Sequence, residues 1–330
     1  MNPFELTRKL IDIESISGNE RVVSDFLRDC LIEMGAAVET EEAEPNRPNV
    51  FAAWGKPDVV LSTHMDTVPP FIASSEDENF IYGRGACDAK GIIAAQIGAA
   101  EQLLSRGVEG FGLLFVVGEE RNNAGALAAN RNPRGSRYLI NGEPTENKLA
   151  LGTKGVLRVV LEATGRAAHS AYPELGESAT EKLLAALNRL RAMDLPTDAL
   201  LGKTTCNIGL IHGGIAPNVI PSAASAELMY RLVESGRSLF DKVQELTKGL
   251  VTVKKVLEIP PVHLTAMEGL ETSVVAYATD IPELSHWGQP FLLGPGSIHV
   301  AHTMEERISK VELMQAVEIY VNMVKRLKGS

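Results

Sequence analysis

The sequence predicts an α/β fold: a three-layer domain with a mostly parallel sheet, into which a smaller α+β domain is inserted. Three observations lead to this prediction. Apolar strands alternate with amphipathic helices in the first part of the chain, which is typical of a parallel sheet with helices on both faces. Around Gly155 the order changes to β-α-β-β-α-β, the order of a ferredoxin-like layer. After Val262 the chain returns to the first pattern and closes on a long amphipathic helix.

The first part of the chain alternates between helices and short strands. Apolar residues at helical spacing predict helices, and two of these end at glycines, Gly35 and Gly107. Continuous apolar runs of a few residues predict buried strands. The expected helices are Phe4–Ile13, Glu20–Met34 and Ala89–Ser105, and the expected strands are Ala37–Thr40, Val50–Trp54, Asp58–Thr63, Phe111–Val117 and Tyr138–Ile140.

The inserted domain is predicted to span residues 155–262, so that residues 1–154 and 263–330 together form the larger domain. Its strands are expected at Val156–Ala163, Thr204–Ile211, Ala223–Val233 and Lys254–Glu258, and its helices at Glu177–Met193 and Ser235–Leu250. The returning segment is expected to form a helix at Leu270–Ala278, a strand at Phe291–Leu293 and the closing helix Lys310–Leu327.

Composition excludes several classes of function. The net charge of −10 over 330 residues disfavours nucleic acid as a partner. The sequence contains no uninterrupted run of about 18 apolar residues, so we expect no membrane span. The three scattered cysteines argue against a disulfide framework, and the amphipathic N-terminus lacks the apolar core of a signal peptide. We therefore expect a cytoplasmic enzyme or binding protein.

Chemically active residues concentrate at the ends of the predicted strands. His64 and Asp66 follow one strand two residues apart, so that their side chains share a face and Asp66 can hold the imidazole of His64. Glu119, Glu120 and Glu143 follow two other strands. Because the carboxyl ends of parallel strands meet at one edge of a sheet, these side chains are expected to converge there.

The segments HMDTVP, YGRGACDAKG and GEPT, in this order, resemble the M20 family of co-catalytic zinc amidohydrolases and peptidases. The resemblance continues to the AHT segment at His302 and implies two Zn²⁺ ions per subunit, for which Co²⁺ or Mn²⁺ could substitute. It implies that Glu119 is the general base. The implied ligands are His64, Asp88 and Glu143 for one ion, and Asp88, Glu120 and His302 for the other. His299 competes with His302 for the last position, and His302 is preferred.

The same resemblance implies that the inserted domain is a lid that forms a homodimer. His169, in the segment GRAAHSAYP, then stabilises the oxyanion and reaches the site of the partner subunit. Asn218 and Arg231 are candidate substrate contacts, because an arginine can bind a carboxylate bidentately. Gly296 and Ser297 could offer further donors to a substrate carboxylate.

The main hypothesis for function is a hydrolase that cleaves the amide bond of a small N-acyl amino acid, in the manner of acetylornithine deacetylase. One alternative in the same family is a di- or tripeptidase or a carboxypeptidase, acting on short peptides. Another is a hydrolase that releases lysine or ornithine from an acidic carrier protein, against which the net charge argues. A catalytically inactive binding protein is a further alternative, disfavoured because the implied ligands and base are all present.

Overall fold

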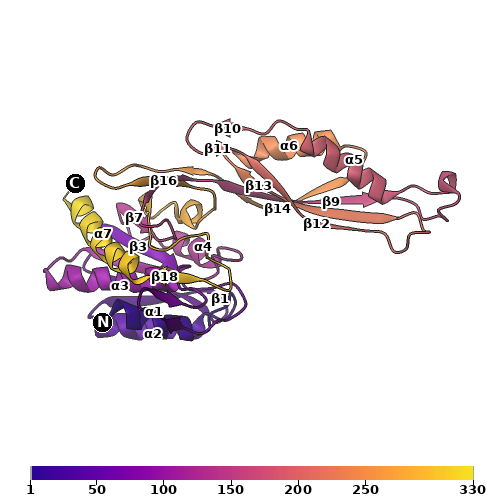
Figure 1. The fold of residues 1–330 in the computed structure, drawn as a ribbon. Helices are drawn as coiled ribbons and strands as arrows, with labels where there is room; N and C mark the ends of the chain where they lie inside the picture. The colour runs from indigo at the N-terminus through magenta and orange to yellow at the C-terminus, as the bar shows by residue number, and fades with distance from the viewer. Residues whose placement is uncertain (1, 330) are drawn as a thin grey trace. The chain divides into compact units, whose positions relative to one another are not determined.

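A computed structural model describes residues 2–329 of the chain. These residues form two compact units, each with its own sheet and helices (Figure 1). The first unit comprises the residues up to Leu151, Leu264–Ser273 and the residues from Thr279 onward. The second comprises Gly152–His263 and Val274–Ala278. The roles expected for the two parts, zinc binding and lid, stay predictions.

A six-stranded sheet in the order β1-β2-β6-β3-β7-β17 forms the centre of the first unit. Its members β6, β3, β7 and β17 run parallel, whereas β1 and β2 pair antiparallel at one side. The mostly parallel sheet is therefore confirmed, with a two-stranded antiparallel edge. The strands are β1 (Ala37–Glu44), β2 (Arg47–Trp54), β3 (Val59–His64), β6 (Phe111–Val116), β7 (Tyr138–Asn141) and β17 (Gln289–Leu292).

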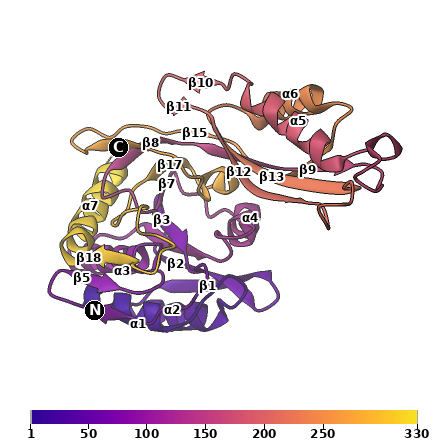
Figure 2. The same ribbon diagram turned by 45° about the vertical axis from the view of Figure 1, so that its right-hand side comes forward.

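Helices cover both faces of this sheet, as the alternation of side chains along its strands shows. Leu61 and its neighbours on one face pack with α1, α2, α3 and α7, whereas Val60 and the opposite face pack with α4. Helix α7 packs against α3, and Figure 2 shows α7 at the left of this unit. The helices are α1 (Pro3–Asp12), α2 (Arg21–Glu33), α3 (Lys90–Ser105), α4 (Ala124–Arg131) and α7 (Lys310–Lys328), with the short 3₁₀ helix η2 (Ile281–Leu284) beside α4.

The described residues also form two three-stranded sheets. The order β18-β5-β4 joins β4 (Ser75–Glu76), β5 (Phe80–Tyr82) and β18 (Arg307–Ser309), and the order β15-β8-β16 joins β8 (Leu149–Thr153), β15 (Val262–His263) and β16 (Thr272–Val275). The first of these brings the C-terminal part of the chain against the segment that precedes α3. None of the described helices is long and apolar enough to span a membrane.

The second unit contains an antiparallel sheet in the order β12-β13-β9-β14, with β12 at its edge. Together with α5 and α6 this gives β-α-β-β-α-β, the ferredoxin-like arrangement that the sequence predicts. Its elements are β9 (Gly155–Thr164), the 3₁₀ helix η1 (Pro173–Leu175), α5 (Ala179–Arg191), β10 (Thr197–Asp198), β11 (Gly202–Lys203), β12 (Thr205–Gly213), β13 (Ala223–Leu232), α6 (Gly236–Thr247) and β14 (Thr252–Ile259).

One predicted element is wrong. The helix expected at Leu270–Ala278 is instead the strand β16, Thr272–Val275. Three of its four residues, Thr272, Val274 and Val275, are β-branched and lose side-chain freedom in a helix, so that local propensity favours the strand. The sequence analysis also missed α4, a short alanine-rich helix that begins after Asn123.

Candidate metal centre and active site

The predicted site residues of the first unit meet at the carboxyl edge of the main sheet. His64 is the last residue of β3, and Glu143 follows the end of the neighbouring strand β7 by two residues. Glu119 and Glu120 follow β6, on the other side of β3. Asp88 comes from the loop before α3, and His302 from the loop before β18.

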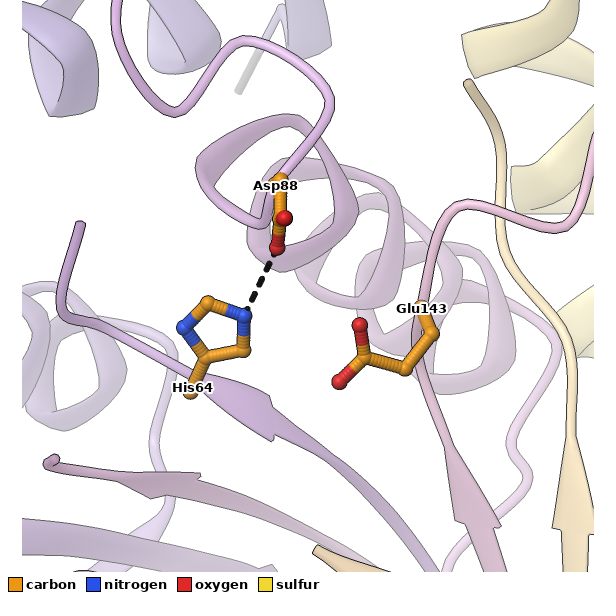
Figure 3. Close-up of side chains that lie close together, drawn as sticks. All are labelled: His64, Asp88 and Glu143. Atoms are coloured by element: carbon orange, nitrogen blue, oxygen red, sulfur yellow. Dashed lines mark hydrogen bonds and ion pairs between the residues drawn. The ribbon is translucent and has the colours of Figure 1, made fainter. Parts of the chain in front are cut away.

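Three of these residues form a first buried group. Ligand atoms of His64, Asp88 and Glu143 lie within 4.8 Å of one another (Figure 3). The Nε2 of His64 is 2.9 Å from Oδ1 of Asp88. The Oε1 of Glu143 is buried and has no hydrogen-bond partner among the described residues. A buried carboxylate oxygen without a partner is costly, so the position of this oxygen fits a ligand to a cation.

Asp88, Glu120 and His302 form a second group, also with ligand atoms within 4.8 Å of one another. The Nε2 of His302 is 2.8 Å from Oε1 of Glu120 and 3.2 Å from Oδ2 of Asp88. The two oxygens of Asp88 thus face different histidines, one in each group. This is the arrangement in which one carboxylate can bridge two ions.

The charges of the two groups fit divalent cations. Burial raises the pKa of Glu119 and of Glu143, and the negative charges nearby raise both further. Hydrogen bonds with Asp88 and Glu120 raise the pKa of His302 to about 10. For Asp88, burial acts in the same direction, but the hydrogen bonds of His302 and His64 outweigh it and lower the pKa of this carboxylate. Carboxylates crowded together in a buried site are stabilised by added positive charge, which divalent cations would supply.

The tautomer of His64 also fits. Its Nδ1 lies 3.0 Å from the backbone carbonyl oxygen of Asp66, which can only accept, so Nδ1 carries a proton. Its Nε2 lies 2.9 Å from Oδ1 of Asp88, which also accepts. A cation held between Nε2 and Asp88 would take the place of the proton there, while Nδ1–H would still donate to the carbonyl oxygen.

Asp66 has a wider role in the geometry than the sequence analysis expected. Its carboxylate is 3.5 Å from Nδ1 of His64 and accepts shorter bonds elsewhere. Ser17 Oγ donates to it at 2.6 Å, and the backbone N–H groups of Glu119 and Glu120 donate at 3.1 and 3.2 Å. Asp66 therefore holds the backbone of the two glutamates as well as the histidine.

The N–H of Gly296 and the hydroxyl of Ser297 are bound within the chain. The N–H of Gly296 donates to Glu312 at 3.2 Å, and Oγ of Ser297 donates to Glu146 at 2.9 Å. A Cβ on Gly296 would lie 2.5 Å from Cβ of Cys87, so this glycine allows close packing. Because both donors bind carboxylates of this chain, we propose no substrate contact for them.

The remaining candidates belong to the second unit, where His169 and Asn218 lie together. Ser170 N donates to the carbonyl of Asn218 at 3.0 Å, and Ile220 N donates to the carbonyl of Ala168 at 2.9 Å. The N–H of Ala171 donates to Nδ1 of His169 at 3.1 Å, so the exposed Nε2 carries the proton of the neutral ring and can donate.

Arg231 is not part of this pair. It lies near the end of β13, whereas the Asn218 loop precedes the start of that strand at Ala223. Eight residues of extended chain separate Ala223 from Arg231, about 26 Å at roughly 3.3 Å a residue. Burial lowers the pKa of the Arg231 guanidinium. One copy of this unit therefore cannot bring Arg231 to the same bound group as Asn218.

Two further residues at the site escaped the sequence analysis. The sequence analysis gave Ser17 no role at the site, although its Oγ donates to Asp66. Asp280 is 1% exposed, and neither of its carboxylate oxygens has a hydrogen-bond partner among the described residues. Burial, with the nearby charge of Asp66, raises its pKa to about 7. No sequence motif marks Asp280, and it follows the segment Leu270–Ala278, for which the sequence analysis predicted a helix.

Two adjoining sets of carboxylate and histidine ligands, at the carboxyl edge of a largely parallel sheet, are the arrangement by which metal-dependent hydrolases activate water. Residues 60–326 match the model of Peptidase family M20/M25/M40. The chain belongs to this family.

Related proteins agree with this assignment. A peptidase M20 domain-containing protein of Schizosaccharomyces pombe is 42% identical, over 98% of this chain and 84% of its own length. A probable carboxypeptidase of Aspergillus niger is 38% identical, over 98% of this chain and 89% of its own. Among solved structures, a tripeptidase from Staphylococcus aureus superposes with a TM-score of 0.83 at 21% identity, covering 99% of this chain and 98% of that one.

Proposed function

We propose that this protein is a two-metal peptidase that removes the C-terminal residue of short peptides. The observation that carries the proposal is the pair of donor groups that share Asp88 beside Glu119. The carboxypeptidase name of a relative at 38% identity supports a peptide substrate. This proposal replaces acetylornithine deacetylase activity as the favoured hypothesis.

In this proposal each ion has three protein ligands. His64, Asp88 and Glu143 would hold one, and Asp88, Glu120 and His302 would hold the other. Nitrogen and oxygen donors of this kind suit Zn²⁺, and Co²⁺ or Mn²⁺ could substitute. When bound, the ions would polarise the scissile carbonyl and lower the pKa of a water molecule.

The residues of the chain then move the proton. Glu119 would take a proton from the water as its oxygen attacks the carbonyl carbon. When the C–N bond breaks, Glu119 would return that proton to the leaving amine, which balances the reaction without a covalent enzyme intermediate. Asp66, through its bonds to the N–H groups of Glu119 and Glu120, would keep the base and the adjacent ligand in place.

Matched tripeptides test the substrate class. We expect release of the C-terminal residue from an N-acetylated tripeptide, because the proposed cleavage needs a free carboxylate and no free amine. The same peptide with a C-terminal amide should be cleaved far more slowly. Products are measured by mass spectrometry, with N-acetylornithine and a free tripeptide in parallel. Deacetylation of N-acetylornithine alone would restore the deacylase hypothesis, and release of N-terminal residues alone would indicate an aminopeptidase.

We also propose that the second unit mediates a homodimer. Strand β12 lies at the edge of its sheet, and its Leu210 and Ile211 are 48% and 56% exposed. An apolar edge strand invites pairing with another strand, and a second copy offers a matching edge. In such a dimer His169 would donate Nε2–H to the oxyanion in the site of the partner subunit, and Asn218 would contact the substrate.

Mixing two inactive variants tests this sharing of the site. His169→Ala is expected to lower turnover by about 10²–10³-fold with both ions bound, the usual cost of removing one oxyanion donor. When it is mixed with Glu119→Gln and subunits exchange, one site of each heterodimer regains both groups, and activity should exceed that of either parent. His286→Ala, a change at an exposed histidine of the first unit that belongs to neither donor group, is the matched control. Parental activity after proven exchange would refute the sharing.

A further inference from the structure

Glu306 is a buried acid to which the proposed reaction gives no role. It is 1% exposed, and its carboxylate collects four donors from one loop, one of them the thiol of Cys87 at 3.8 Å from Oε1. Oε1 accepts from the backbone N–H of Gly85 at 2.9 Å and from that of Asp88 at 3.3 Å. Oε2 forms a close ion pair with Nη1 of Arg84. The segment from Arg84 to Asp88 is thus fixed to a single side chain.

The place of Glu306 in the chain joins this segment to His302. It lies four residues after His302 and directly before β18, which pairs with β5 just ahead of the Asp88 loop. The backbone also takes part, since Gly83 N donates to the carbonyl of Glu306 at 3.1 Å. One residue therefore connects the loop that carries Asp88 to the loop that carries His302.

Asp88 and His302, the ligands on these two loops, need such a connection more than the ligands that lie at strand ends. His64 ends a central strand and Glu143 follows another, so the sheet itself positions both. His302 lies on a loop, with its side chain 47% exposed and its φ at +65°. The 3.2 Å separation between His302 Nε2 and Asp88 Oδ2 depends on how the two loops are held.

We propose that Glu306 is a positioning residue that sets Asp88 against His302 and thereby sets the affinity for the ion of the second group. This rests on the proposed metal ligands. Arg84 makes the arrangement tolerable, because its guanidinium balances the charge of Glu306 close to an acidic cluster. Residues that orient metal ligands from behind typically change metal affinity 10–100-fold when they are replaced.

The test uses pairs of variants that differ only in the hydrogen-bond acceptor. Replacing Glu306 alone would leave the buried Arg84 unpaired and could prevent folding, so Arg84→Met is the common background. In this background Glu306→Gln keeps an acceptor for the N–H groups of Gly85 and Asp88. Glu306→Met has nearly the same length and shape without an acceptor. Glu305→Gln, a change at the exposed neighbour, is the control in the wild-type background.

Affinities for Zn²⁺ are measured by competition with a chelating dye, and the unfolding temperature is measured on the metal-free proteins. We expect Arg84→Met/Glu306→Gln to bind two ions, the second about 10–100 times more tightly than Arg84→Met/Glu306→Met does. Glu306→Asp, which keeps the charge but shortens the side chain, should also weaken the second ion. A merely structural role would lower the unfolding temperature of the metal-free protein and leave ion affinity unchanged.

The outcomes separate this inference from the proposed function. Two ions in the wild type with equal second-ion affinities in the matched pair would overturn the role of Glu306 and leave the metal centre standing. Fewer than two ions in the wild type would overturn the metal centre and this inference with it. A weakened second ion in the methionine variant and in Glu306→Asp, with wild-type binding in Glu305→Gln, would establish the positioning role.

Discussion

Glu119→Gln is expected to lower kcat on a peptide substrate by about 10²–10⁴-fold while both ions remain bound. Glutamine has the size of glutamate but cannot take a proton from water or return one to the leaving amine. The change leaves the proposed ligands in place, because Glu119 belongs to neither donor group. Its backbone N–H keeps the bond to Asp66, so the loop should hold its position.

Two measurements check this expectation: steady-state hydrolysis and the metal content of the same preparation. Glu109→Gln is the matched control, because Glu109 is exposed and precedes β6, at the opposite end of the strand that Glu119 follows. The control should keep wild-type activity. A Glu119→Gln protein that holds two ions and turns over at the wild-type rate would show that another group is the base.

His302→Ala is expected to reduce bound metal from two ions to one per chain, and to reduce hydrolysis in proportion to the loss of the second ion. His302 is the only histidine of the second group, 2.8 Å from Glu120 and 3.2 Å from Asp88. His299→Ala should leave both ions bound, since His299 belongs to neither group. The two histidines are three residues apart on the same loop, which makes them a close comparison.

Elemental analysis after dialysis distinguishes the two variants. The reverse result, with metal lost from His299→Ala and kept by His302→Ala, would mean that the ligand had been assigned to the wrong histidine. Equal loss from both would point to damage to the loop instead, and the unfolding temperatures of the metal-free variants would reveal it.

Much of the candidate site could be placed from the sequence because its residues follow buried strands. His64, Glu119 and Glu143 each stand at or just past an apolar run, and parallel strands bring such positions to one edge. The wider ligand set depended on family resemblance, since nothing in the local pattern brings His302 to Asp88 across more than two hundred residues.

The parts that could not be predicted depend on contacts between distant segments. Gly296 looked like an open donor, but its N–H binds Glu312 of α7. The sequence analysis assigned no role to Glu306, which pairs with Arg84 directly before β18, the strand that pairs with β5. The error at Leu270–Ala278 is of another kind: the β-branched residues there carried the correct signal, and helical spacing was given too much weight.

The most direct test of the two-metal centre is the metal content of the wild-type chain, measured as peptide hydrolysis is restored to the metal-free protein. The two donor groups predict two Zn²⁺ ions per chain, loss of hydrolysis on chelation, and its return as both sites fill. A chain that binds no more than one ion at saturation, or that cleaves peptides equally well after chelation, would contradict this account.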